Sequence, residues 1–464
     1  MNIFRWTPVL LLSFLFGCDL KPELKVWQST GGSVAVETYQ TRRSPCKEFE
    51  WHSSCYQFIS QETQELTATA DEGYKFLGWS GACSGTETCV LTMNKSREVT
   101  ASFSKTEYDF SEILPTLNNF IAQHQIFKGA SIIVVRKDEG VLYEVATGNQ
   151  TLDTIALIAS ASKVPAASIL MSLIDDDLLQ HDQPIEELVP WKKHKPGITV
   201  EGMLSNTSGL PGLISESDPK NLYQPHALCF ILPELKMCAQ YVYELDIGSD
   251  LSTPGSVFNY GGAQWQLAGG VAEYVSGKRW SQLVKERLIE PCGLQIFQYG
   301  FNFTPIWNGQ PYSLLRNNNP YIEAGAISNL SDYGKLLMMH LNGGLCGNHR
   351  VLSANSVNEM LIDRGTPAGK DPYARIAGEG NWSFPSGYGM GWWIKLNEDG
   401  SPSSIYFDAG AYGSIAWMDK EREYAAFVIM EDYRFPPSTE IEGIVEEFFL
   451  SILPVMEKAI DSTL

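Results

Sequence analysis

Ser160 and Lys163, in the segment Ser160-Ala161-Ser162-Lys163, have the types and spacing for nucleophilic chemistry. Positions three apart lie on one face of a helix, so the lysine amine can reach the serine hydroxyl. Desolvation lowers the pKa of such a lysine, which can then accept the serine proton. The helix N-terminus would add backbone N–H groups that favour a developing anion. Because serine and lysine are common, this pair alone favours an ordinary helix start, and other motifs must decide.

Other catalytic signatures are absent from the sequence. There is no Gly-x-Ser-x-Gly nucleophile elbow. There is also no His-Glu-x-x-His helix of the kind that binds zinc. The nine cysteines include no Cys-x-x-Cys, and the seven histidines are scattered. We therefore expect neither a metal nor a cofactor.

The elements that must position Ser160 and Lys163 are predicted to be both strands and helices. Strand patterns cover 130–136, 141–145, 414–418 and 424–430. Helical spacing recurs at about 109–124, 160–176, 264–276 and 330–342, and an amphipathic helix over 440–453 follows near the end. Strands on both sides of a helical middle predict an α+β fold, with an antiparallel sheet flanked by helices.

Four further motifs follow the Ser-x-x-Lys pair. They are Met203-Leu-Ser-Asn-Thr-Ser-Gly-Leu-Pro-Gly212, Pro254-Gly-Ser-Val-Phe-Asn-Tyr-Gly-Gly262, Ala324-Gly-Ala-Ile-Ser-Asn-Leu-Ser-Asp-Tyr333 and Asp408-Ala-Gly-Ala-Tyr-Gly413. In this order the set resembles the beta-lactamase-related serine hydrolases: class C beta-lactamases, penicillin-binding DD-peptidases and their esterase relatives. The resemblance covers about residues 110–455. It implies a beta-lactamase/transpeptidase-like fold, in which an all-helical region accompanies the sheet.

The resemblance also implies a role for each matched residue. Ser160 would be the nucleophile that forms an acyl-enzyme, and Lys163 its general base or proton relay. Tyr260 would carry a proton between Ser160 and the leaving group. The backbone N–H groups of Ser160 and Ala411 would form the oxyanion hole. The alternative for Tyr260 is a packed core aromatic, but the glycines on both sides of it favour the site.

Two departures from the family pattern bear on the substrate. The third motif is usually Lys-Thr-Gly, or has His for Lys, whereas here it is Asp408-Ala409-Gly410. A cation at that place attracts a substrate carboxylate, which an aspartate would repel. The Asn of the family's Tyr-x-Asn motif is Gly262, which removes a side-chain amide. With Gly262, Asp408 and Gly410 as candidate substrate-binding residues, we expect a small-molecule or peptide substrate without a free carboxylate. The activity expected is that of an esterase or amidase.

Residues 22–105 show a different pattern from the rest of the chain. Short period-two runs at 33–37, 65–70 and 98–103 lie between turn-rich segments, which predicts a small β domain. The core Gly78-Trp-Ser-Gly-Ala-Cys-Ser-Gly85 resembles the bacterial repeat domains of surface and exported proteins. That resemblance implies a spacer or adhesive module. The predicted organisation is therefore a signal over 1–18, a β domain over 22–105 and a hydrolase domain over 106–464.

The first 18 residues predict export. An apolar run from Val9 to Phe16 follows one arginine and is too short for a permanent membrane span. Its end, Leu15-Phe16-Gly17-Cys18, resembles a bacterial lipobox, in which Cys18 would be lipidated and become the mature N-terminus. The alternative is an ordinary signal peptide with a chance cysteine. We expect a lipoprotein anchored by lipid in the bacterial cell envelope, on the periplasmic side or at the surface.

Eight cysteines remain when Cys18 is set aside, an even number that suits an oxidising compartment. Neighbours in sequence suggest the disulfides Cys46–Cys55, Cys83–Cys89, Cys229–Cys238 and Cys292–Cys346. The third lies in the segment 213–253, which is either a lid near the site or a stabilised surface hairpin.

The net charge of −20 argues against a nucleic-acid partner, which needs a basic face. The same charge argues against attachment to an anionic membrane by charge alone, so membrane contact is expected through the lipid anchor. The sequence does not predict an oligomeric state. Three alternatives to an esterase remain. They are a DD-peptidase or beta-lactamase, a catalytically silent cell-envelope binding protein of the same fold, and an adhesin whose main function lies in residues 22–105.

Overall fold

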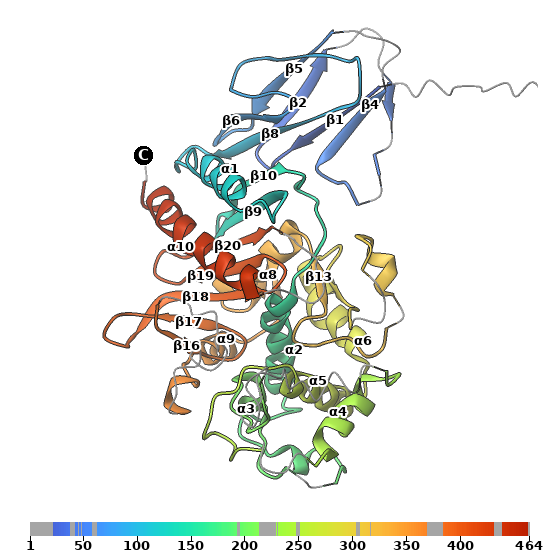
Figure 1. Cartoon of the computed structure of the whole chain (residues 1–464), viewed down its shortest axis with the longest axis vertical. Coiled ribbons are helices and arrows are strands. Elements are labelled where there is room, and N and C mark those ends of the chain that lie inside the picture. Colours follow the sequence, from blue (N-terminus) through green and yellow to red (C-terminus); the bar gives the residue numbers. More distant parts are fainter. Residues whose placement is uncertain are drawn as a thin grey trace, which may run out of the picture.

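The computed structural model confirms the predicted α+β fold (Figure 1). It describes residues 22–37, 42–44, 46–47, 49–57, 63–192, 195–212, 229, 231–246, 251–302, 307–315, 317–368, 384–430 and 439–462. The predicted signal and Cys18 lie outside these residues, as does about half of the segment 213–253 predicted to be a lid or hairpin. Among the described residues, no helix is both long and apolar enough to cross a membrane.

A large sheet forms the centre of the molecule. Seven of its strands come from residues 106–464, the predicted hydrolase domain, here called the hydrolase part. They are β9 (Gly129–Arg136), β10 (Gly140–Gly148), β16 (Ser386–Tyr388), β17 (Trp393–Leu396), β18 (Pro402–Gly410), β19 (Ser414–Asp419) and β20 (Tyr424–Ile429). Their order is β16-β17-β18-β19-β20-β9-β10, and every neighbouring pair is antiparallel. The sheet thus joins strands from the beginning and the end of this part.

The N-terminal module, which is the predicted β domain over residues 22–105, extends the same sheet. Its strands are β1 (Glu23–Gln28), β2 (Gly32–Glu37), β3 (Arg42–Ser44), β4 (Ser53–Gln57), β5 (Thr63–Ala70), β6 (Tyr74–Gly81), β7 (Cys89–Thr92) and β8 (Arg97–Lys105). Strand β8 pairs with β10 at Ser104 and Tyr143, and with β1 in parallel. Strands β2, β5 and β7 form a second sheet.

Buried polar contacts also join the module to the hydrolase part. The backbone N–H and hydroxyl of Thr30 donate to Glu144 Oε1 at 2.7 and 2.9 Å. The backbone N–H of His52 donates to Asp153 Oδ2 at 2.7 Å, and its ring Nδ1 lies 2.6 Å from Asp153 Oδ1. Since Glu144 and Asp153 are both buried, these contacts fix the module against its neighbour.

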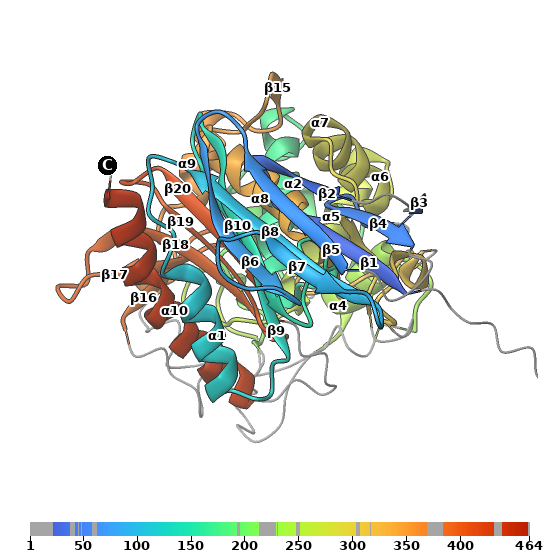
Figure 2. The ribbon, with the colours of Figure 1, turned by 90° about the horizontal axis from the view of Figure 1, so that it is seen from above.

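Helices cover both faces of the sheet, because side chains alternate between faces along each strand. On β9, Ile132 and Val134 face one apolar cluster, and Ile133 and Val135 face another. Helices α1 (Ile113–Gln123) and α10 (Thr439–Asp461) lie side by side on the first face, as Figure 2 shows. The other face carries α2 (Lys163–Asp175), α3 (Val200–Leu204), α4 (Leu235–Glu244), α5 (Ala263–Ser276), α6 (Trp280–Val284), α7 (Glu290–Cys292), α8 (Leu330–Leu341) and α9 (Ala354–Met360).

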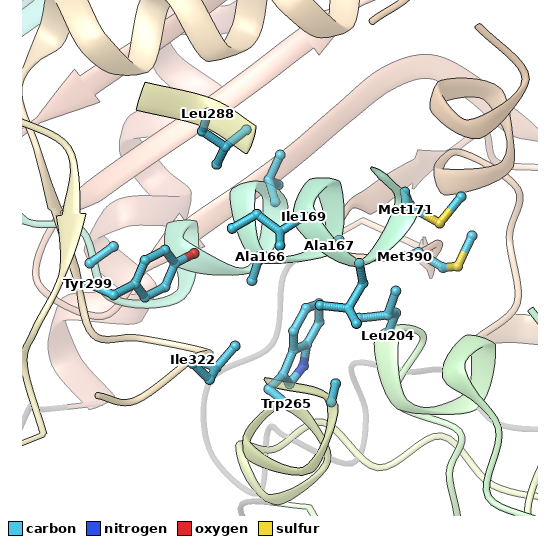
Figure 3. Close-up of a cluster of buried hydrophobic side chains, with 14 of the residues drawn as sticks. Ala166, Ala167, Ile169, Met171, Leu204, Trp265, Leu288, Tyr299, Ile322 and Met390 are labelled. Carbon is cyan, nitrogen blue, oxygen red and sulfur yellow. The ribbon is translucent and has the colours of Figure 1, made fainter. Parts of the chain in front are cut away.

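Helix α2 runs through the middle of the larger core. All of its residues from Lys163 to Leu173 are buried, as expected for a helix that is apolar nearly all round. Figure 3 shows Ala166, Ala167 and Ile169 of α2 next to Trp265 of α5 and Leu204 of α3. Because α2 is packed on all sides, its first turn has a fixed position.

Two further expectations can be compared with the structure. All four predicted disulfides are present: Cys46–Cys55, Cys83–Cys89, Cys229–Cys238 and Cys292–Cys346. The last helix is longer than the predicted 440–453, because it continues through Pro454 to Asp461. Burial of Met456, Ala459 and Ile460 in the core offsets the hydrogen bond that proline cannot donate.

Candidate active site

Ser160 lies in a tight turn just before the central helix. It belongs to the 3₁₀ turn Ala159–Ser162, in which the other three residues are buried, and α2 follows directly. Ala159 has a left-handed φ of 44°, a strained conformation that is common next to functional side chains. The preceding residue, Ile158, donates its N–H to Ala326 O at 3.1 Å and accepts from Ser414 Oγ at 2.8 Å. Strands β13 (Ala326–Ser328) and β19 therefore hold the turn in place.

Lys163 meets Ser160 as the spacing predicts. Its Nζ donates to Ser160 Oγ at 2.9 Å and to the Glu323 backbone carbonyl at 3.1 Å. The side chain is 1% exposed, and this burial lowers the pKa of Lys163 to about 8, although the charges of Asp408 and Glu323 oppose the shift. At pH 7 about a tenth of the amine is then neutral, far more than for an ordinary lysine, and can act as a base.

Tyr260 lies beside the lysine. Lys163 Nζ is 4.5 Å from the centroid of the Tyr260 ring, within the range of a cation–π contact. The same ring packs against Trp393 at 5.2 Å and Tyr388 at 6.0 Å between centroids. Tyr260 is thus a packed aromatic and also a neighbour of the Ser160–Lys163 pair, so the two interpretations of this residue are compatible.

The motif 203–212 supports the loop that carries Tyr260. Asn206, with a left-handed φ of 59°, accepts side-chain hydrogen bonds from Gln264 at 2.7 Å and Trp265 at 3.1 Å. Its carbonyl accepts from the N–H of Asn259 at 2.8 Å. A Cβ on Gly212 would lie 2.6 Å from the Tyr260 carbonyl, so only glycine allows this close approach. The motif therefore serves to position the loop that carries Tyr260, because its side chains bind other parts of the protein.

The end of β18 comes close to the nucleophile turn. A Cβ on Gly410 would lie 2.2 Å from the Ile158 carbonyl, two residues before Ser160. Ala411 follows at the strand end and packs, partly buried, against the apolar cluster that contains Ala159. This arrangement brings the chain around Ala411 to the same side as Ser160, as an oxyanion hole from their two N–H groups requires.

Gly410→Ala is expected to lower kcat at least about tenfold with little loss of secondary structure, since the added methyl displaces the strand end from the Ser160 turn. Steady-state kinetics and circular dichroism check this. Gly443→Ala in α10 is the matched control, because a Cβ there meets no atom within 4 Å. Wild-type kcat in Gly410→Ala would show that the close approach has no catalytic role.

The other two candidate substrate-binding residues offer no exposed side chain. Asp408 is 0% exposed, and its carboxylate oxygens have no hydrogen-bond partner that meets normal geometry among the described residues. Burial raises the pKa of Asp408 well above its usual value, which favours the neutral acid. A substrate carboxylate is therefore disfavoured mainly because this place holds no cation. Direct repulsion by Asp408, which the sequence predicted, matters less. Gly262 is the buried N-cap of α5.

Sequence reasoning missed two neighbours of the site. Glu323 contributes only its backbone carbonyl to Lys163, and Trp393 contributes a ring face to Tyr260. Trp393 is buried in β17. One group of potential metal ligands occurs among the described residues, Cys46, Glu50 and Cys55. The disulfide between its cysteines leaves no thiolate for a metal.

Comparison with known proteins decides the family. Residues 117–443 match the family model described as Beta-lactamase, which is more than half of the chain. The chain belongs to the beta-lactamase family. Members of this beta-lactamase family are serine hydrolases, and both the position of Ser160 and the large sheet agree with that class. Residues 53–107 match a second model, the Divergent InlB B-repeat domain.

Relatives within the beta-lactamase family bear several names. The chain is 25% identical over 311 residues to Penicillin-binding protein 4 of Amycolatopsis lactamdurans, covering 59% of this chain and 73% of that protein. It is 22% identical over 364 residues to D-alanyl-D-alanine-carboxypeptidase/endopeptidase AmpH of Escherichia coli K12, covering 74% and 89%. A solved structure from Bacteroides dorei, described as a beta-lactamase, matches with a TM-score of 0.58 and 25% identity. The match covers 76% of this chain and 99% of that one.

Proposed function

We propose that this chain is an exported serine hydrolase that forms an acyl-enzyme on Ser160 and acts as an esterase or amidase. The observation that supports this most directly is the 2.9 Å contact between Lys163 Nζ and Ser160 Oγ at the start of the central helix. The burial that lowers the pKa of Lys163 to about 8 supports it further. A serine beside a lysine that can be neutral is an activated nucleophile.

In the proposed reaction, Lys163 takes the proton of Ser160 while Ser160 Oγ bonds to the substrate carbonyl carbon. The carbonyl oxygen gains negative charge, which the N–H groups of Ser160 and Ala411 stabilise. The bond to the leaving group then breaks, and the leaving group receives a proton through Tyr260. Water attacks the acyl-enzyme carbonyl, gives up a proton to the same groups, and releases the acid with Ser160 restored.

The preference for esters and amides without a free carboxylate follows from Asp408 and Gly262. Where the family pattern has a lysine or histidine, this chain has a buried carboxyl group. A substrate carboxylate would therefore find no cation at that place, which weakens its binding. Gly262 supplies no amide to hold a peptide or beta-lactam amide.

A panel of substrates tests this proposal. We expect p-nitrophenyl acetate and butyrate to give higher kcat/KM values than nitrocefin and a D-alanyl-D-alanine peptide. Mass spectrometry should locate an organophosphonate probe on Ser160. Faster hydrolysis of nitrocefin or of the D-alanyl peptide would instead support the second candidate, a beta-lactamase or DD-carboxypeptidase, which the names of the two relatives favour.

A catalytically silent binding protein of the same fold is the alternative from another class, and the altered third motif is what motivates it. Such a protein would turn over none of the panel and would leave Ser160 unlabelled by the phosphonate. The short contact between Lys163 and Ser160 argues against it, because a binding role needs no buried lysine beside the serine.

Export is part of the proposal. The four disulfides fit an oxidising compartment outside the cytoplasm. We propose that segment 1–18 is the export signal and that Cys18 carries the lipid that anchors the protein in the cell envelope.

A further inference from the structure

The loop between β3 and β4 of the N-terminal module reaches the hydrolase part. The Cys46–Cys55 disulfide closes the base of this loop. His52, at its far end, is bound twice to the buried carboxylate of Asp153. The loop between these two fixed points carries Phe49 and Trp51, so both rings are held near the hydrolase part.

Phe49 packs onto the side of the hydrolase part that holds the active site. It contacts an apolar cluster that contains Ala159, the residue before Ser160, and Tyr412, the residue after Ala411. Its ring centroid lies 5.6 Å from that of Tyr312. Phe49 also has a left-handed φ of 68°, an unfavourable conformation for a bulky residue. The neighbouring contacts hold it there, which is typical of functional positions.

The rings beside Phe49 are open to solvent. Trp51, whose ring centroid is 5.8 Å from that of Phe49, is 50% exposed, and Tyr312 is 54% exposed. Leu315, on the same segment as Tyr312, is also exposed. Single exposed apolar residues are ordinary, but here Trp51 and Tyr312 both adjoin Phe49, which packs on the cluster that contains Ala159 and Tyr412. Adjoining apolar groups of this kind are typical of a binding surface.

We propose that Phe49 and Tyr312 form a substrate subsite for an extended apolar group, and that Phe49 is a specificity-determining residue supplied by the N-terminal module. This inference rests on the proposed function. The occupant is the apolar part of the ester or amide itself, because the row of rings continues from the cluster around Ala159 and Ala411. The N-terminal module would then select substrates as well as extend the sheet.

The experiment compares short and long esters with the full chain and its variants. Phe49→Ala and Tyr312→Ala are expected to lower kcat/KM about tenfold for p-nitrophenyl octanoate, mainly through KM, and to leave p-nitrophenyl acetate within about twofold. Octyl acetate, followed by released acetate, extends the leaving group instead of the acyl group. The ester that loses rate shows which side of the carbonyl faces Phe49.

Controls separate the possible outcomes. Val90→Ala removes another exposed apolar side chain of the module, outside this cluster, and should leave both esters unchanged. Phe49→Leu keeps apolar volume and should retain part of the preference for octanoate even if Phe49→Ala folds poorly. Equal effects of the Phe49 and Tyr312 variants on short and long esters would overturn the subsite while leaving the proposed function intact. Failure to hydrolyse p-nitrophenyl acetate in a Ser160-dependent way would overturn both.

Discussion

Ser160→Ala is expected to lower kcat/KM for p-nitrophenyl acetate by at least about 10³-fold and to abolish labelling by an organophosphonate. The variant removes the hydroxyl oxygen of Ser160, which Lys163 Nζ contacts at 2.9 Å, and alanine is smaller than serine, so it fits the turn. Stopped assays with purified protein and mass spectrometry of the labelled peptide give the measurement.

Ser172→Ala is the matched control for that variant. Ser172 is a buried serine within α2, and its hydroxyl donates to the Ile169 carbonyl of the same helix at 2.7 Å. Activity and labelling should stay near those of the wild type. Full activity in Ser160→Ala would mean that another group carries out the hydrolysis, and the acyl-enzyme proposal would have to be given up.

Lys163→Met is expected to lower kcat/KM by about 10²- to 10⁴-fold, the usual contribution of a general base. Methionine preserves apolar volume in a site where the lysine is fully buried. The pH profile adds a second test. Because the neutral amine is the base and the pKa of Lys163 is lowered to about 8, wild-type kcat/KM should rise as pH increases through about 8 and level off above it. Lys163→Met should lose this rise.

Lys195→Met is the control for a buried lysine in general. Burial also lowers the pKa of Lys195 to about 8, but its Nζ donates to the backbone carbonyls of Tyr243 and Leu245. The change should affect stability and leave the pH profile unaltered. A profile that keeps its rise in Lys163→Met would assign the titrating group to some other residue.

Local patterns in the sequence predicted what depends on local geometry. The three-residue spacing of Ser160 and Lys163 predicted that the amine can reach the hydroxyl, and the two atoms are 2.9 Å apart, although their catalytic role rested on the further motifs. Strand-like runs at 130–136, 141–145, 414–418 and 424–430 also located β9, β10, β19 and β20. Tyr260 lies a hundred residues from Ser160, so only the resemblance to a family could associate it with the pair.

What could not be predicted depends on packing between distant segments. The carboxyl of Asp408 is buried because of the face of β18 on which it lies. Which face of the strand is buried depends on the helices that pack against the sheet. The acceptor that Glu323 offers to Lys163 is a backbone carbonyl, which any residue would have. Phe49 reaches the hydrolase part through a fold that the β pattern of residues 22–105 does not specify.

Because β8 pairs with β10, the described strands of the N-terminal module cover that edge of the hydrolase sheet. A fragment expressed from residue 106 onward would leave the backbone amides and carbonyls along β10 without that neighbour. An unpaired sheet edge can pair with a strand of another copy, so the shortened protein would tend to self-associate and precipitate.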